Sequence, residues 1–534
     1  MKNYPLYELL SYRDFPELLR GLAGKYGDAP AITCYTADGA AVTHTYAQLE
    51  RNAENAAALF AEMGFAGKNI TLIGENSYGW LIAFFGAATA GKTVTPIDLE
   101  QSTETIRNAV LHVDTELLVL SASAQAVVRE IPELAALPAL GMESEEYRAV
   151  LEKTEPPAEP APILCENILV YTSGTTSAPK AVMLTPAGIL SNAGAAGSMV
   201  RLIPPVYTSL PFYHVYGLTC GLIASLLIGA NVCVNGSLKT MIRDLRLFGP
   251  KTVMAVPLIA EQFYKMLRSA APGVSETAGK PEKRRLFEKK RAAVPSEEAL
   301  RVKRELFGEL ELIVCGGAHL SQEVIDGLAS FGILVLQGYG ITECSPLVCV
   351  NRNMNYSAGT VGLPLPNTEV RLSAEGEILV RGPGVTAGYY KEPELTKTAF
   401  ENGWFKTGDE GAFDRRGFLR ISGRIKNLIV MKNGKKVLPE EMEGYLMKIP
   451  LVKSAVVYGA KTGVESDDVK IAASVYPDPA VAADATPYEI LAKLQEEING
   501  LNRRLPIYKQ IQIVNLSNTE QERTALGKAR RNQN

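Results

Sequence analysis

Paired cysteines are missing from this sequence. Its seven cysteines are an odd number, none of them forms a C-x-x-C pair, and most stand in apolar runs. Such a distribution favours buried, reduced thiols over disulfides, which predicts a cytoplasmic location. The first eight residues also lack the apolar segment of a signal peptide, so no secretory signal is expected.

An excess of charge of one sign is missing as well. The net charge is −3, so no broad basic field indicates a nucleic-acid partner. Lysine and arginine do gather between Lys280 and Arg304. We expect this segment, residues 280–304, to be a solvated helix face, with weak peripheral contact to anionic membrane lipids as the alternative.

No long apolar run continues without a break. The longest run extends from Gly217 to Val234 and reaches the length at which membrane-spanning helices begin. The Gly-Ala-Asn sequence at residues 229–231 interrupts it near its end. This interruption favours a buried helix followed by a buried strand.

The residues that are present indicate a globular protein with more than one domain. The chain is 46% hydrophobic and 21% charged, and its 534 residues exceed what one core can hold. Helix and strand patterns alternate through its first part, which is typical of an α/β fold with doubly wound sheets. The expected helices span Phe15–Tyr26, Tyr46–Met63, Gly79–Ala90 and Thr103–His112, and the expected strands span Asn69–Gly74, Thr93–Ile97 and Glu116–Leu120.

The pattern changes after about Gly359. Short strands among glycine and proline turns predict a small β-barrel-like part at residues 359–422. From Gly423 onward, strands and helices mix again. This mixture indicates a separate α+β C-terminal domain of roughly 110 residues.

A run of hydroxyl residues, one glycine and one lysine occupies residues 171–180, Tyr-Thr-Ser-Gly-Thr-Thr-Ser-Ala-Pro-Lys. It lies between two expected strands, so the N–H groups of the turn can converge on an anion. The hydroxyls of Ser173, Thr175 and Thr176 and the charge of Lys180 indicate a polyphosphate ligand. Proline rather than glycine precedes the lysine, which argues against a P-loop, and a plain surface turn is the alternative.

A second motif occupies residues 336–343, Leu-Gln-Gly-Tyr-Gly-Ile-Thr-Glu. The two glycines allow a flat ligand to approach the backbone closely, and Tyr339 offers a face for stacking on a base. Thr342 supplies a hydroxyl and Glu343 a carboxylate that suits Mg²⁺. A turn with a core tyrosine is the alternative interpretation.

Three further motifs carry charged side chains. Asp409 ends the run Trp-Phe-Lys-Thr-Gly-Asp, where its two oxygens can accept both hydroxyls of a ribose; an Asx-turn is the alternative. Arg424, in the run at residues 423–429, can reach ribose or phosphate. Lys528 ends the run Arg-Thr-Ala-Leu-Gly-Lys, for which a frayed basic tail is the alternative.

These motifs, in this order, resemble those of the adenylate-forming enzymes, a family of acyl-CoA ligases, luciferases and peptide-synthetase adenylation domains. The resemblance extends from about Tyr46 to Lys528, and the chain looks most like a fatty acyl-CoA ligase of the long-chain type. Ser177 and Ala181 stand where the family has glycines, and Glu522 stands where it has proline. The resemblance implies an N-terminal adenylation domain at residues 1–422, a hinge at residues 423–426 and a mobile C-terminal domain at residues 427–534.

The resemblance also implies the roles of individual residues. Catalytic roles fall on His214, Thr342, Glu343 and Lys528, and Mg²⁺ is assigned to Thr175 and Glu343. Nucleotide or CoA contacts fall on Thr172, Ser173, Gly174, Thr175, Thr176, Lys180, Gly316, Gly317, Ala318, Gln337, Gly338, Tyr339, Asp409, Arg424, the hinge residue Lys426, and Gly434 in the loop that lines the pantetheine tunnel.

The reaction implied by the resemblance has two steps. A carboxylic acid and ATP with Mg²⁺ give acyl-AMP and pyrophosphate, and CoA then accepts the acyl group. The position of His214 gates the acyl pocket in the family. The segment around His214, residues 210–217, carries no aspartate that could hold an α-amine. The glycine at residue 340 leaves the acyl pocket open, so the resemblance implies a medium- or long-chain fatty acid. A carrier protein as acceptor, or a non-catalytic nucleotide-binding protein, is the alternative.

The assigned role of Lys528 generates a first prediction. Lys528→Ala is expected to slow adenylation by roughly 10²–10³-fold, because one donor to the charge of the transition state is lost. Transfer from preformed acyl-AMP to CoA should survive. The two half-reactions are measured separately, and an equal loss in both would contradict the assignment.

Overall fold

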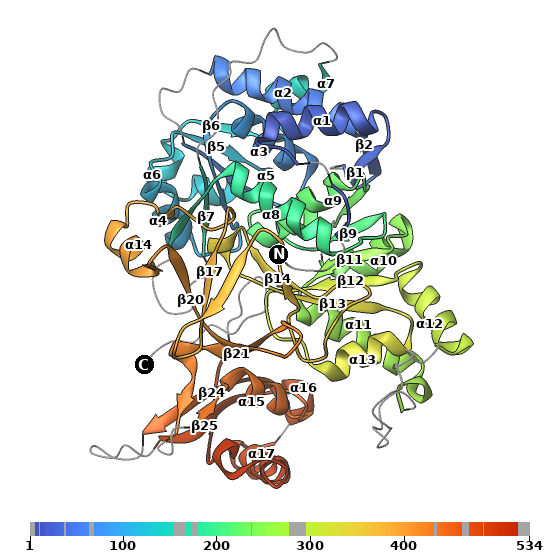
Figure 1. Cartoon of the computed structure of the whole chain (residues 1–534), viewed down its shortest axis with the longest axis vertical. Helices are drawn as coiled ribbons and strands as arrows, with labels where there is room; N and C mark the ends of the chain where they lie inside the picture. Colours follow the sequence, from blue (N-terminus) through green and yellow to red (C-terminus); the bar gives the residue numbers. More distant parts are fainter. Residues whose placement is uncertain are drawn as a thin grey trace. The chain divides into compact units, whose positions relative to one another are not determined.

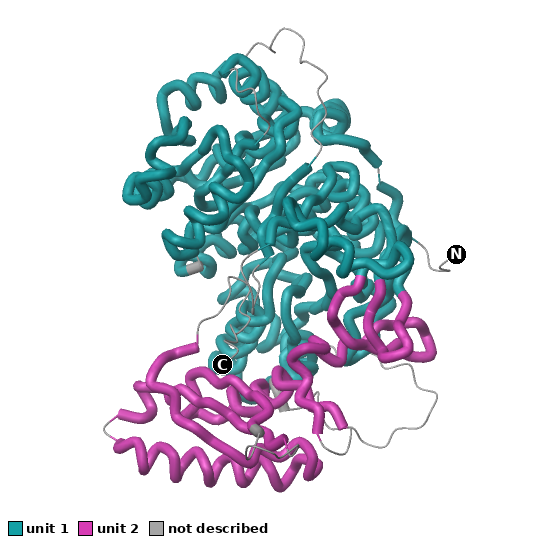
Figure 2. The backbone as a smooth tube through the Cα atoms, turned by 90° about the vertical axis from the view of Figure 1, so that its left-hand side faces the viewer, with its two compact units in different colours: residues 1–172, 179–370, 380–405 teal, residues 173–178, 371–379, 406–534 magenta. Residues whose placement is uncertain are grey.

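The computed structural model describes residues 6–9, 11–36, 39–63, 69–153, 167–172, 180–235, 238–276, 295–431, 435–461, 469–483 and 485–521. The chain forms two compact units, which are described separately (Figure 2). The first unit holds residues 1–172, 179–370 and 380–405. The second unit holds residues 173–178, 371–379 and 406–534.

A seven-stranded sheet forms one layer of the first unit, in the order β18-β8-β7-β4-β3-β5-β6. β7, β4, β3, β5 and β6 are parallel, whereas β8 and β18 are antiparallel to their neighbours. Its strands are β3 (Asn69–Ile73), β4 (Thr93–Ile97), β5 (Leu117–Leu120), β6 (Ala139–Gly141), β7 (Ile168–Tyr171), β8 (Ala181–Leu184) and β18 (Gly388–Tyr389). The strands are short and apolar, as expected of a sheet covered on both faces.

The helices that cover this sheet follow from local sequence. α1 (Phe15–Tyr26) begins as expected at Asp14, whose carboxylate accepts a hydrogen bond from the N–H of Glu17. α2 (Tyr46–Glu62) packs against α3 (Tyr78–Thr89), and α3 packs on β3 and β4 (Figure 1). Because α3 lies between α2 and the sheet, nearly all of its residues are buried, and its sequence shows no polar stripe.

A nine-stranded sheet forms the other layer, in the order β15-β14-β13-β12-β11-β9-β10-β1-β2. Its centre, from β1 to β13, is parallel, which confirms the doubly wound α/β prediction. β1 and β2 form an antiparallel hairpin on either side of Asp38–Gly39, a pair of residues that is typical of hairpin turns. The strands are β1 (Pro30–Tyr35), β2 (Ala41–Thr45), β9 (Val206–Thr208), β10 (Val232–Val234), β11 (Thr252–Ala255), β12 (Leu312–Cys315), β13 (Leu334–Gly340), β14 (Leu347–Val350) and β15 (Leu363–Pro364).

The long apolar run is buried in the first unit. It forms a π-helix, η1 (Tyr216–Ile223), then the short α9 (Ala224–Leu227) and the strand β10, so the expected order of helix and strand is confirmed. The π-helical form was not foreseen. A Cβ on Gly217 would lie 2.1 Å from the carbonyl oxygen of Pro211, so only glycine allows this close start. Among the described residues, no helix has both the length and the apolar character needed to cross a membrane.

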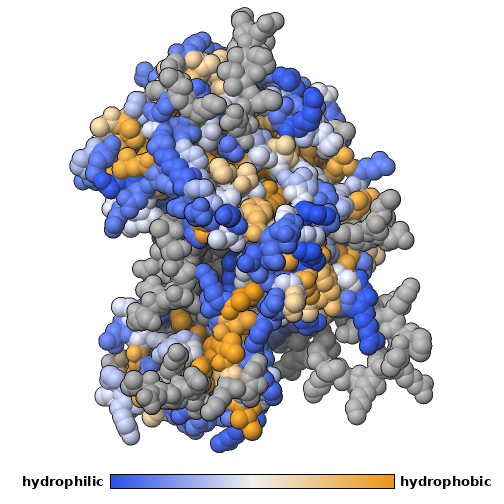
Figure 3. Space-filling model, turned by 60° about the vertical axis from the view of Figure 1, so that its left-hand side comes forward, coloured by the Kyte–Doolittle hydropathy of each residue, from blue (hydrophilic) through white to orange (hydrophobic). Residues whose placement is uncertain are grey.

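The basic segment at residues 280–304 lies partly outside the described residues. Its described end belongs to α12 (Glu297–Phe307), which begins at Ser296 and buries Ala299, Val302 and Phe307. Lys303 is buried as well, so the expected solvated face is found only for the exposed charged residues, such as Arg301 and Arg304. On the face drawn in Figure 3, hydrophilic residues dominate and apolar residues occur in small groups.

A five-stranded sheet corresponds to the β-barrel-like part expected after residue 359. Its order is β16-β17-β20-β19, and β21 also pairs with β20. The longest strand of this sheet, β20, pairs with β21 over residues 409–413. The strands are β16 (Glu369–Leu372), β17 (Glu377–Arg381), β19 (Phe400–Glu401), β20 (Trp404–Phe413) and β21 (Leu419–Arg424).

The second unit has a small α+β core of its own, as predicted. A three-stranded sheet, β24-β25-β26, carries Val457 and Ile471 against Leu494 and Ile498 of α17. A two-stranded sheet of β22 and β23 precedes it. The elements are β22 (Ile429–Val430), β23 (Lys436–Val437), α15 (Pro439–Leu446), β24 (Val452–Lys461), β25 (Val469–Pro477), α16 (Pro479–Ala482), α17 (Pro487–Asn502) and β26 (Ile513–Leu516).

A stacked histidine makes the stability of the first unit depend on pH. The ring of His44 lies flat on Tyr78, with 3.5 Å between the ring centroids, and burial lowers the pKa of His44 to about 4. Because this value is below the value of about 6.5 in the unfolded chain, the unfolded state binds the proton first as the pH falls. The stabilisation is therefore present above pH 6.5 and is lost between pH 6.5 and 4.

We expect the wild-type chain to lose about 2 kcal/mol more unfolding free energy than His44→Phe between pH 7 and pH 5. Phenylalanine keeps a stacked ring and does not titrate. Urea unfolding at both pH values can be followed by tryptophan fluorescence, since both tryptophans, Trp80 and Trp404, belong to the first unit. The same pH dependence in both proteins would show that His44 does not contribute.

Candidate active site

The base of the predicted phosphate loop is closed by its own backbone. β7 and β8 pair directly, with Tyr171 opposite Ala181. The N–H of Thr172 donates to the carbonyl oxygen of Lys180 at 3.0 Å. Residues 173–179, which include the predicted Ser173, Gly174, Thr175 and Thr176, lie outside the described residues, so their roles stay predictions.

The second motif ends in a tight turn beside this hairpin. β13 continues to Gly340, beyond the expected strand end, because Gly338 and Tyr339 pair with Val350 and Cys349 of β14. Thr342 and Glu343 then form a single 3₁₀ turn, η4 (Thr342–Cys344).

The turn is held from two directions. Asn192 of α8 (Pro186–Met199) is 2% exposed, donates to the carbonyl oxygens of Cys344 and Leu347 at 3.0 and 2.8 Å, and accepts from the N–H of Leu347 at 3.1 Å. The N–H of Thr386 donates to the carbonyl oxygen of Glu343 at 2.8 Å. Buried hydrogen bonds of this kind fix the backbone, since breaking one leaves a buried group without a partner.

One tyrosine contacts both charged residues that were predicted for the first unit. The hydroxyl of Tyr389 donates to Oε1 of Glu343 at 2.9 Å. Nζ of Lys180 lies 5.5 Å from the centroid of the same ring, within the range of a cation–π contact. The structure therefore brings Lys180 and Glu343 to one place.

Two more sets of predicted site residues, 316–318 and 338–339, lie together at the ends of β12 and β13. The two strands are parallel, with Cys315 opposite Gln337, so Gly316–Gly317–Ala318 follow the end of β12 at the same edge at which Gly338–Tyr339 extend β13. Open α/β sheets bind ligands at this carboxyl edge. The side chain of Gln337 is buried and donates to the carbonyl oxygen of Leu320 at 3.2 Å, so it holds this edge together.

The glycines at this edge have local steric reasons. A Cβ on Gly340 would lie 2.3 Å from the carbonyl oxygen of Pro346, and one on Gly316 would lie 3.3 Å from the Tyr216 ring. The approach of the Pro346 backbone alone requires glycine at residue 340. The interpretation of this glycine as the opening of an acyl pocket stays a prediction.

His214 precedes the π-helix η1. The N–H of Tyr216 donates to its Nδ1 at 3.1 Å. This contact requires Nδ1 to be an acceptor, so in the neutral ring the proton lies on Nε2. The predicted role of His214 at the acyl pocket stays a prediction.

The described cysteines are packing groups. All six of them are buried and none forms a disulfide, as expected. Burial raises the pKa of Cys34 to about 11 and that of Cys220 and Cys233 to about 12. These thiols are therefore neutral and unreactive at ordinary pH.

The second unit holds the predicted Asp409 and Arg424 side by side. β20 and β21 place them opposite each other, and Nε of Arg424 lies 3.0 Å from Oδ1 of Asp409. Asp409 is 5% exposed and its N–H donates to Thr407 at 3.1 Å. Lys426 follows in the exposed turn η5 (Ile425–Asn427). Gly434 and Lys528 lie outside the described residues.

The side chains of the first unit that could ligate a metal fit an Mg²⁺ ion that is bound together with a phosphate ligand. Mg²⁺ is usually held by one or two carboxylates together with phosphates and water, and Glu343 supplies one carboxylate. No group of three or more histidine, cysteine or acidic side chains that could hold a metal occurs in the described part of the chain. A metal site built by protein side chains alone is therefore not found there.

Sequence reasoning missed the residues that support this site. Asn192 lies in the small-residue run Ser-Asn-Ala-Gly-Ala-Ala-Gly, and Thr386 lies in a loop, and neither shows a local signal of its role. Tyr389 belongs to a run that matches the family, Gly-Tyr-Tyr, but nothing in that run indicates its contact with Glu343.

Comparison with known proteins gives similarities along the whole chain. A family model described as AMP-binding enzyme matches residues 19–390, and one described as AMP-binding enzyme C-terminal domain matches residues 426–534. A long-chain-fatty-acid–CoA ligase of Mycobacterium bovis is 29% identical over 430 residues, which cover 74% of this chain and 71% of that protein. A long-chain-fatty-acid–CoA ligase of Salmonella typhimurium is 28% identical over 534 residues, which cover 89% and 88%.

The fold is also found among solved structures. The crystal structure of an anthranilate CoA ligase in complex with anthranoyl-AMP superposes with a TM-score of 0.77 at 18% identity, covering 98% of this chain and 96% of that chain. At this identity the likeness shows the shared mixed α/β architecture.

The hydrogen bonds of Asn192 generate a prediction on stability. Asn192→Ala is expected to lower the unfolding free energy of the first unit by about 2–3 kcal/mol, because two buried carbonyl oxygens and one N–H lose their partner. Asn108→Ala, at an exposed position of the helix at residues 103–112, should change it by less than about 0.5 kcal/mol. Urea unfolding followed by tryptophan fluorescence measures both; equal small effects would contradict the structural role of Asn192.

Proposed function

The chain belongs to the AMP-binding enzyme family, and we propose on that basis that it activates a medium- or long-chain fatty acid and transfers it to CoA. The chain is an acid–thiol ligase of this family. In this proposal ATP and CoA are its co-substrates. The finer proposal concerns the acid, the positions of the substrates and the residues that act on them.

The contact of Lys180 and Glu343 with one tyrosine carries the proposal for the ATP site. A cation and a carboxylate at one place suit a polyphosphate and the Mg²⁺ that it carries. When bound, Mg²⁺ neutralises part of the phosphate charge. The backbone bond that closes the loop base keeps Lys180 at the mouth of the turn, where its charge is directed to the phosphates.

We assign the remaining contacts of ATP as the motifs suggest. Tyr339 stacks on adenine at the carboxyl edge of β13, beside the glycines at residues 316–317. Thr342 donates to the α-phosphate. Asp409 accepts the ribose hydroxyls, and the ion pair with Arg424 holds its carboxylate in one orientation.

The first step needs a carboxylate close to the α-phosphate. In the proposal, Lys528 lies between them and offsets the charge that develops as pyrophosphate leaves. The acid enters past His214 and the π-helix η1, whose residues are buried and mostly apolar. Exclusion of water from such surroundings protects the acyl-AMP from hydrolysis.

The second step needs the thiol of CoA at the acyl carbonyl. We propose that the C-terminal domain turns about Lys426 after adenylation, since a few residues at the end of an element can absorb such a change. Gly434 then lies in the loop that admits the pantetheine arm. The two relatives reported above are named as CoA ligases, which supports CoA rather than a carrier protein as acceptor.

The fatty acid is the part of the proposal that depends on the relatives. Both are named long-chain-fatty-acid–CoA ligases. One solved structure with the same fold is that of an anthranilate CoA ligase, so the fold by itself does not select an alkyl chain. The sequence at residues 210–217 contains no acidic residue, which disfavours an amino acid as the substrate, because its ammonium group would need a partner.

Pyrophosphate release with ATP and Mg²⁺ tests the proposal over a panel of acids from acetate to stearate together with aromatic acids. Repeated turnover that requires CoA and is highest with a medium or long chain is expected. A single turnover that does not respond to CoA would indicate a carrier protein as acceptor. Highest turnover with an aromatic acid would contradict the fatty-acid assignment, and no release with any acid would contradict ligase activity on this panel.

A further inference from the structure

We propose that Tyr389 is a positioning residue for the Mg²⁺–ATP complex. Its hydroxyl orients the Glu343 carboxylate, and its ring holds the Lys180 ammonium group. This inference deepens the proposed function and depends on it. Tyr389 does not itself contact the reacting atoms in this proposal, so its effect is exerted through Glu343 and Lys180.

The hydroxyl of Tyr389 restricts the Glu343 side chain to one orientation. It donates a hydrogen bond to Oε1 of Glu343 at 2.9 Å. Among the described residues, this hydroxyl is the donor found for the Glu343 carboxylate. A carboxylate with one oxygen held in this way presents the other oxygen in a fixed direction. Partners that orient a metal-ligating carboxylate typically change metal affinity 10–100-fold when they are removed.

The ring of Tyr389 acts on the other charge. Lys180 has a long flexible side chain, and its ammonium group lies 5.5 Å from the ring centroid. A cation–π contact at a partly exposed site contributes an energy that corresponds to about a two- to fivefold change in a binding constant. This energy is small, so the ring is expected to adjust the position of the lysine, and the hydroxyl is expected to have the larger effect on Mg²⁺–ATP.

Tyr389 is itself held firmly, as a positioning residue must be. It is 7% exposed and lies in β18, opposite Val182 of β8. Its N–H donates to Oγ1 of Thr396 in α14 (Pro393–Ala399) at 2.9 Å. A Cβ on the preceding Gly388 would lie 2.4 Å from the Thr396 side chain, so the strand and α14 approach as closely as glycine allows.

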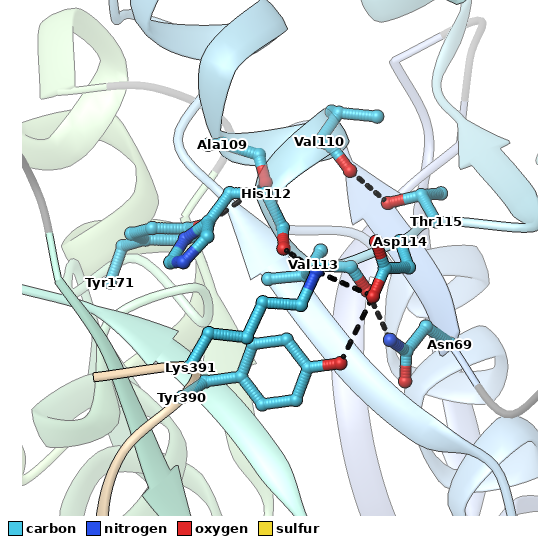
Figure 4. A network of polar contacts seen from close by, with 10 residues as sticks. All are labelled: Asn69, Ala109, Val110, His112, Val113, Asp114, Thr115, Tyr171, Tyr390 and Lys391. Atoms are coloured by element: carbon cyan, nitrogen blue, oxygen red, sulfur yellow. Dashed lines mark hydrogen bonds and ion pairs between the residues drawn. The ribbon is translucent and has the colours of Figure 1, made fainter. Parts of the chain in front are cut away.

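The next residue, Tyr390, supplies a matched control. Its hydroxyl donates to Oδ2 of Asp114 at 3.3 Å, in a separate network with Lys391 and His112 (Figure 4). Its backbone N–H donates to the carbonyl oxygen of Ala181, so it remains in the same sheet as Tyr389. Tyr390→Phe therefore removes one tyrosine hydroxyl from the same segment without changing a contact of Glu343 or Lys180.

The first test is equilibrium binding of ATP by calorimetry, with Mg²⁺ and with EDTA in its place. Tyr389→Phe is expected to weaken binding of Mg²⁺–ATP at least about tenfold and to leave metal-free ATP unchanged, because only the Glu343 contact is lost. Tyr389→Leu should also weaken metal-free ATP about two- to fivefold, because the ring contact of Lys180 is lost as well. Tyr390→Phe should bind both forms as the wild type does.

The second test is the Mg²⁺ dependence of acid-dependent AMP formation. Tyr389→Phe should need at least about ten times more free Mg²⁺ for half its maximal rate, and a high Mg²⁺ concentration should restore most of that rate. A purely structural defect would lower the rate by the same factor at every Mg²⁺ concentration, and that result would overturn the inference.

The outcomes separate this inference from the proposed function. Wild-type binding of Mg²⁺–ATP together with an unchanged Tyr389→Phe variant would overturn the inference and leave the function standing. Equal effects of Tyr389→Phe and Tyr390→Phe would also overturn it. A wild-type chain that does not bind ATP would overturn the proposed function and this inference with it.

Discussion

The candidate ATP site of the first unit depends on the antiparallel pairing of β18 with β8. This pairing sets Gly388 opposite Met183 and Tyr389 opposite Val182, although the two strands are about 200 residues apart in sequence. Through it, the residue that contacts Glu343 lies beside the strand that begins after Lys180. Because neighbouring strands have a fixed spacing and side-chain direction, this pairing sets the positions of the Lys180, Glu343 and Tyr389 side chains relative to one another.

Two sets of contacts hold this edge of the sheet, and they differ in strength. On the outer side, Lys391 forms an ion pair with Asp114 and donates to the carbonyl oxygen of His112 at the end of α4 (Thr103–His112), as Figure 4 shows. Both charged side chains are largely exposed, and such a pair contributes about 0–1 kcal/mol. Asp114 and Lys391 also have φ values of 52° and 58°, which costs energy for residues with a Cβ.

The buried hydrogen bonds of Asn192 are therefore the stronger restraint on the site. Tyr171, at the end of β7, belongs to the outer network too, because its hydroxyl donates to the carbonyl oxygen of Ala109 at 2.8 Å. This contact satisfies one of the last carbonyl groups of α4 and links the helix to the entry of the phosphate loop. The site thus has buried hydrogen bonds behind Glu343 and side-chain caps behind the phosphate loop.

Local signals in the sequence were sufficient for most single elements. α1, α4 and β4 begin and end where they were expected, because caps such as Asp14 and Ser102 and alternating apolar residues mark them. Long-range pairing was not predictable in this way: β13 is longer than expected because β14 pairs with it. For the same reason the motifs identified Lys180 and Glu343 but not Tyr389, whose role depends on a strand partner 200 residues away. The assignments of Thr175, Gly434 and Lys528 are supported by motif resemblance and not by geometry.

The most direct measurement of the central claim is the fate of a carboxyl oxygen. If the chain forms acyl-AMP, a fatty acid labelled with ¹⁸O in its carboxyl group must transfer one labelled oxygen to AMP when ATP and CoA are supplied. Mass spectrometry of the products should therefore find AMP with one ¹⁸O and pyrophosphate with none. Unlabelled AMP, or ADP in its place, would contradict activation through an acyl adenylate.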